Sequence, residues 1–197
     1  MNSLLQTLTD SMGDDFLGQV SQSLGSDTKK TKGALDMALP LLLGALQKNT
    51  QADGGAGLAK AVAKKHNGSV LNNFSDLVAN PDKGEGAGIL GHLFGKNEAG
   101  AEKLLASQAG ISEKESGGLL KILAPMVLGA VGKSMGSSSS KGGLDLGSLT
   151  SLISGGAKEA DKKSSLSSSL LTSFLDQNND GSIIDDILKM GMNFFKK

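Results

Sequence analysis

The residues whose spacing most specifically suggests chemistry form an acidic turn near the C-terminus. Oxygen donors occupy positions 1, 3, 5 and 7 of a calcium loop, at Asp176, Asn178, Asp180 and Ser182. Gly181 at position 6 permits the sharp turn that such a loop requires. Calcium takes six to eight oxygen ligands, so short carboxylates and amides on one turn suit it. The pattern therefore predicts a calcium site here.

The end of this turn departs from an EF-hand. Position 12 is Ile187, where a bidentate Glu belongs, and the available carboxylates are Asp185 and Asp186 at positions 10 and 11. This arrangement resembles the shortened loops of dockerin-like calcium modules, in which the following helix supplies the last acidic ligand. The alternative is a plain turn whose polar residues cap the flanking helices.

No other set of residues predicts a reaction. The chain has no Cys, and its only histidines are His66 and His92. We expect His66 to end a helix and His92 to be packed or hydrogen-bonded in an apolar turn. A nucleophilic or acid–base site would have to use scattered Asp, Glu, Lys and Ser residues, which form no recognisable constellation. We therefore expect a non-enzymatic protein with no catalytic residues and no cofactor besides calcium.

Charge and composition limit the partners. The 20 basic residues balance the 20 acidic ones, and every basic residue is Lys. Arginine is the usual bidentate reader of phosphate and guanine, so the sequence does not predict nucleic-acid binding. The longest apolar runs, residues 37–46 and 122–131, are about half the roughly 20 residues that cross a membrane. The last helix has a polar face of mixed charge, which disfavours membrane-surface binding. We expect a cytoplasmic protein that binds a partner protein or itself.

Two apolar stretches that must organise the fold, residues 37–48 and 122–133, share one pattern. The offset between them is a constant 85 residues. Identical residues in register include the pairs Gly25/Gly110, Lys29/Lys114, Gly33/Gly118, Leu35/Leu120, Pro40/Pro125, Gly44/Gly129, Ala45/Ala130 and Lys48/Lys133. Such a register indicates an internal duplication. A second echo pairs residues 67–77 with residues 180–190 at an offset of 113.

The predicted fold class is all-α, a multihelical bundle built from a tandem helical repeat. The chain is rich in Leu, Ala, Lys and Gly and poor in the β-branched and aromatic residues that strands favour. Each apolar stretch contains a proline, so its helix either bends there or gives way to a second short helix. We expect both stretches in one core. The residues expected to be mostly buried there are Leu39, Leu42, Leu43, Leu46, Leu123, Val127, Leu128 and Val131.

Changes in composition divide the chain into three parts. Residues 1–135 form the predicted helical repeat domain. Residues 136–165 form a Ser/Gly-rich low-complexity insertion with a weak helix, in which residues 137–143 are expected to be irregular and exposed. Residues 166–197 form a helix–turn–helix that completes the second repeat and contains the acidic turn.

The segments ALPLLLGAL, HNGSVLNNF, GILGHLFG and LAPMVLGAV resemble the YidB-like family of bacterial proteins, a domain family of unknown function. The resemblance covers roughly residues 1–135. It implies a small, all-helical, cytoplasmic protein with a tandem helical repeat, and it implies no catalytic residues. Two functions stay open from the sequence. One is a helical scaffold or protein-interaction module with a calcium-binding turn, and the other is a small-molecule-binding or enzymatic protein with a cleft between the repeats.

Overall fold

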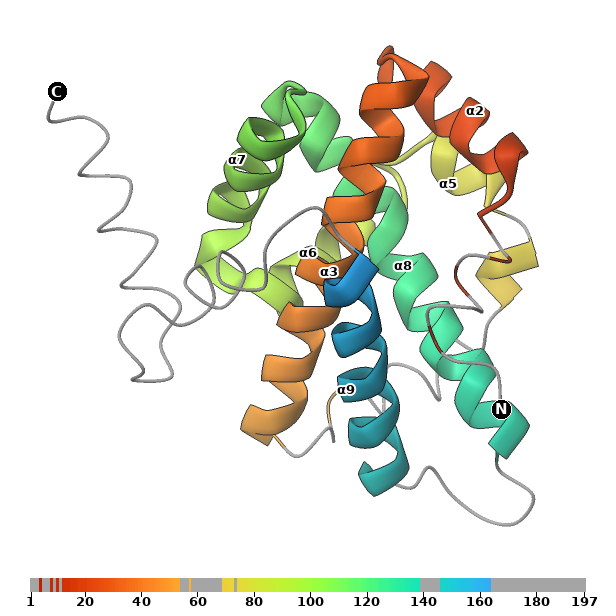
Figure 1. Ribbon diagram of the computed structural model, residues 1–197, viewed down its shortest axis with the longest axis vertical. Coiled ribbons are helices and arrows are strands. Elements are labelled where there is room, and N and C mark those ends of the chain that lie inside the picture. The colour runs from red at the N-terminus through yellow and green to blue at the C-terminus, as the bar shows by residue number, and fades with distance from the viewer. Residues whose placement is uncertain are drawn as a thin grey trace, which may run out of the picture.

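The computed structural model describes residues 4, 8, 10, 12–53, 57, 69–72, 74–138 and 146–163. All regular secondary structure in these residues is helical, so the predicted all-α fold class is confirmed (Figure 1). The α-helices are α2 (Asp14–Leu24), α3 (Thr28–Asp53), α5 (Ser75–Ala79), α6 (Gly86–Phe94), α7 (Glu98–Ala109), α8 (Glu113–Ser138) and α9 (Leu146–Lys163). Two 3₁₀ helices, η1 (Ser69–Asn72) and η2 (Gly95–Asn97), precede α5 and α7.

Two long helices, α3 and α8, correspond to the two predicted copies. Each has 26 residues, and each follows a glycine in the left-handed conformation, Gly25 or Gly110. Both preceding helices end with the same hydrogen bond, which satisfies a carbonyl of the last turn. The Ser26 N–H donates to the Ser21 carbonyl at 2.9 Å, and the Ile111 N–H donates to the Ala106 carbonyl at 3.1 Å. These local matches agree with a duplication, which itself stays a prediction.

Both long helices continue through their prolines. Pro40 lies inside α3 and Pro125 inside α8. A proline has no N–H, so the carbonyl four residues earlier loses its helical donor. These carbonyls belong to Asp36 in α3 and to Lys121 in α8. The structure thus resolves the sequence alternatives in favour of one continuous helix in each copy.

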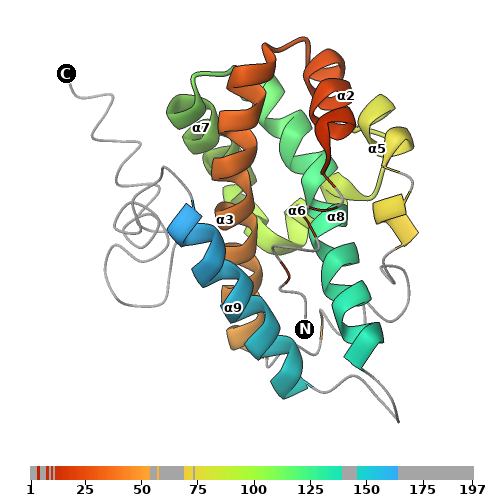
Figure 2. The ribbon, with the colours of Figure 1, turned by 45° about the vertical axis from the view of Figure 1, so that its right-hand side comes forward.

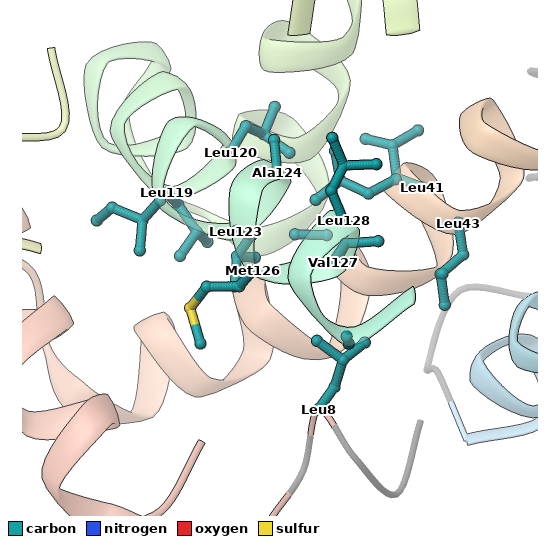
Figure 3. Packing of buried hydrophobic residues seen from close by; sticks show 14 of the residues in the cluster. Leu8, Leu41, Leu43, Leu119, Leu120, Leu123, Ala124, Met126, Val127 and Leu128 are labelled. Atoms are coloured by element: carbon teal, nitrogen blue, oxygen red, sulfur yellow. The ribbon is translucent and has the colours of Figure 1, made fainter. Parts of the chain in front are cut away.

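The two apolar stretches share one core, as predicted. Figure 3 shows side chains from α3 and α8 gathered in one cluster, together with Leu8. Seven of the eight residues expected to be buried are buried: Leu42, Leu43, Leu46, Leu123, Val127, Leu128 and Val131. Leu39 also packs against the core, but it is less deeply buried than the other seven. Helical periodicity identifies the apolar side of a helix but not how far its neighbours extend over that side.

One helix in the described part of the chain is long and apolar enough to cross a membrane, Glu113–Met135 of α8. However, 83% of its apolar window is buried inside the molecule. Such burial is characteristic of a helix in the centre of a core. The apolar composition of this helix is therefore explained by its place in the core of the molecule.

Shorter helices surround the central pair. α6 and α7 pack against α8, and α7 also packs against α3. On the other side, α2 packs against α3 and α5, where the rings of Phe16 and Phe74 meet edge to face at 5.1 Å. α9 lies along α3 and runs antiparallel to it, as the two ribbon views agree (Figures 1 and 2).

The region expected to be a loose insertion is more helical than its composition suggests. Ser137 and Ser138 belong to the last turn of α8, which corrects the expectation that both are irregular. Residues 139–145 lie outside the described residues. α9 then runs from Leu146 to Lys163, through a Ser/Gly-rich sequence, because Ile153 is fully buried and Gly156 lies directly against Leu4. The predicted C-terminal unit, residues 166–197, lies outside the described residues.

Candidate functional site

The predicted calcium ligands lie outside the described residues. They are Asp176, Asn178, Asp180, Ser182, Asp185 and Asp186. Within the part of the chain that the structure describes, no group of three or more His, Cys, Asp or Glu side chains could hold a metal ion. The calcium site at these six residues therefore stays a prediction.

A polar cluster in the described structure lies where three elements meet: α7, α8 and the loop that precedes α6. The Lys121 Nζ of α8 contacts the Asp82 Oδ1 at 2.7 Å, in an ion pair whose lysine is 24% exposed and whose carboxylate is 80% exposed. Next to this pair, α6 approaches α8 very closely. A Cβ added at Gly86 would overlap the Lys121 carbonyl oxygen and lie 2.7 Å from the carbonyl carbon. Only glycine allows this contact, because any Cβ would overlap the oxygen. The same oxygen lacks its helical donor, because the residue four positions later is Pro125.

A second carboxylate, that of Glu102 on α7, lies over the backbone of α8. Its Oε1 would be 2.7 Å from a Cβ added at Gly117. The backbone carbonyl of Glu102 accepts a hydrogen bond from the Ser116 Oγ at 2.8 Å, and Ser116 is fully buried. Small residues in α8 therefore let α7 approach, and the serine hydroxyl fixes its position.

The ionisation of these groups follows from their contacts. The hydrogen bond to Lys121 lowers the pKa of Asp82, and the same bond raises the pKa of Lys121. Burial raises the pKa of Glu102, and the neighbouring Glu98 carboxylate raises it further. A general acid or base works best with a pKa near the operating pH. At neutral pH Lys121 stays protonated and Asp82 ionised, so this pair joins the loop to α8 without offering acid–base chemistry.

The starts of the two long helices also meet. Ser112 and Glu115 form a reciprocal capping box: the Glu115 N–H donates to the Ser112 Oγ at 3.2 Å, and the Ser112 N–H donates to the Glu115 carboxylate at 2.7 Å. In α3 the cap is Asp27, whose carboxylate accepts from the N–H groups of Lys29 and Lys30. The hydrogen bonds with Ser112 lower the pKa of Glu115, and a further one with Ser26 joins the two helix starts.

One surface differs between the two long helices, and we call it the outer face of α3. It consists of Lys32, Asp36 and Leu39, which lie one helical turn apart. The Lys32 and Asp36 side chains are 65% and 52% exposed, with their charged atoms 3.5 Å apart, and Leu39 is half-buried. This face therefore combines charge with accessible apolar surface.

The equivalent positions of α8, 85 residues later, are covered. Gly117 is buried under Glu102, Lys121 lies against Gly86 of α6, and Ala124 is 1% exposed. In the described structure, α8 thus has a covering helix at a place where α3 remains open.

His92 is the one histidine in the described part of the chain. His66 lies outside the described residues, and His92 is exposed on α6. Of the two expectations for His92, packing was wrong, because its neighbours Ile89 and Leu90 take the buried positions of that helix. A hydrogen bond of this histidine stays a prediction.

A family model describing bacterial proteins of unknown function, DUF937, matches residues 6–134. The chain belongs to the DUF937 family. This match confirms the expected YidB-like bacterial family of unknown function. Searches of curated proteins and of solved structures found no match. Membership in the DUF937 family covers the central helices and the outer face of α3, and ends before α9.

The cluster of Asp82, Glu102 and Lys121 was not predicted from the sequence. One signal for it exists, because Lys121 interrupts an otherwise apolar run, Leu119-Leu120-Lys121-Ile122-Leu123. A lysine within a buried helix needs a partner for its charge. The partner itself, on a loop 39 residues earlier, has no local signal.

Proposed function

We propose that this DUF937 protein is a non-enzymatic helical scaffold, which binds a partner protein or a second copy of itself through the outer face of α3. The observation that carries the proposal is the difference between α3 and α8. The two helices have equal length and prolines in register. The outer face of α3 is exposed in the described structure, whereas the equivalent face of α8 is covered by α6 and α7. A partner helix that presents apolar residues and acidic side chains would fit Leu39 and the neighbouring lysines.

The rest of the described structure supports a scaffold over an enzyme. The space between α3 and α8 is filled by apolar side chains of one continuous core. The shifted pKa values of Asp82, Glu115 and Lys121 belong to ion-pairing and capping groups, and that of Glu102 is raised where its carboxylate lies against Gly117 of α8, outside the space between α3 and α8. A cleft between the repeats, as the rival small-molecule or enzymatic function requires, would need polar groups converging between these two helices.

Calcium binding by the acidic turn is the second part of the proposal. Its support is the spacing of Asp176, Asn178 and Asp180 before Gly181. Calorimetric titration of the full chain with calcium tests it directly, beside an Asp176→Ala, Asp180→Ala variant. We expect binding by the natural chain and its loss in the variant. Equal heats from both proteins, or none at millimolar calcium, would leave this turn as a plain capped turn.

The interaction function is tested by affinity capture with the immobilised full chain, in calcium and in EDTA. We expect a bound protein to be lost from a Leu39→Asp variant and retained by a Lys103→Asp variant, whose change lies on an exposed position of α7. Sedimentation velocity of both variants separates self-association from binding of another protein. Capture that is unaffected by Leu39→Asp would contradict the assignment to this face. The cytoplasmic location stays a prediction, to be tested by cell fractionation.

A further inference from the structure

We draw no further inference here: the strongest candidate, the outer face of α3 at Lys32, Asp36 and Leu39, already belongs to the proposed function, and nothing in the described structure shows what covers it.

Discussion

Replacing Gly86 by alanine should destabilise the protein through one contact between α6 and α8. The added Cβ would lie 2.7 Å from the carbonyl carbon of Lys121 and 2.8 Å from its Cα. Carbon atoms in packed interiors sit about 3.5–4.0 Å apart. Both neighbours are backbone atoms in the middle of the most buried helix described, so α6 must move outward by roughly 1 Å.

The magnitude follows from two opposing effects. Overpacking of this kind costs about 1–3 kcal/mol, whereas replacing glycine by alanine within a helix gains about 0.5–1 kcal/mol. We therefore expect Gly86→Ala to lower the free energy of unfolding by about 1–2 kcal/mol. Gly88 of the same helix is exposed and has no atom within 4 Å of an added Cβ. Gly88→Ala should accordingly raise the stability by up to about 1 kcal/mol.

Urea denaturation followed by circular dichroism measures both variants against the natural chain, with the slope m as a check that the compactness of the unfolded state is unchanged. The difference between the two variants, about 1–3 kcal/mol, is the diagnostic quantity because both make the same chemical change in one helix. Equal effects of Gly86→Ala and Gly88→Ala would refute the close approach of α6 to α8.

Further predictions concern ionisation and the ends of helices. Burial raises the pKa of Glu102, so the folded state holds the proton of this carboxyl more tightly than the unfolded state does. The contribution of Glu102 to the free energy of unfolding therefore falls as the pH rises from the ordinary pKa of 4.5 through the raised pKa. Glu102→Gln should therefore be more stable relative to the natural chain at pH 7 than at pH 4, and denaturation curves that show the same difference at both pH values would contradict this. Gly110 has φ of 65°, and Gly110→Ala should lower the unfolding temperature at a cost of about 1–2 kcal/mol. Gly33→Ala, in open space within α3, should raise it instead, and calorimetric scans in which both variants shift the same way would contradict this reasoning.

The central helices could be predicted because their signals are local. The leucine periodicity, the two prolines in register and the glycines Gly25 and Gly110 each act within a few residues, so the ends and the buried sides of α3 and α8 follow from them. The starts of these helices are also encoded locally, in the cap at Asp27 and the capping box at Ser112.

The remaining features depend on contacts between distant parts of the chain. The stretch around Gly155 and Gly156 has the composition of a linker, yet it is helical because tertiary packing overrides its weak propensity. The ion pair of Lys121 requires the loop at Asp82 to fold back over α8. Leu39 belongs to the apolar periodicity of α3, but whether it is covered depends on which helix reaches it. Residues 164–197, which carry the predicted calcium turn, lie outside the described residues.

The pairing of α3 with α9 has a consequence for how the protein is made. α3 is complete when residue 53 has been synthesised, but α9 is complete only at residue 163, after another 110 residues. At about 5–20 residues per second, that interval lasts roughly 5–20 s. During this interval, α9 has not yet been completed and does not cover the side of α3 that carries Gln47. The contacts of α3 with α9 therefore form later in synthesis than its contacts with α2, α7 and α8.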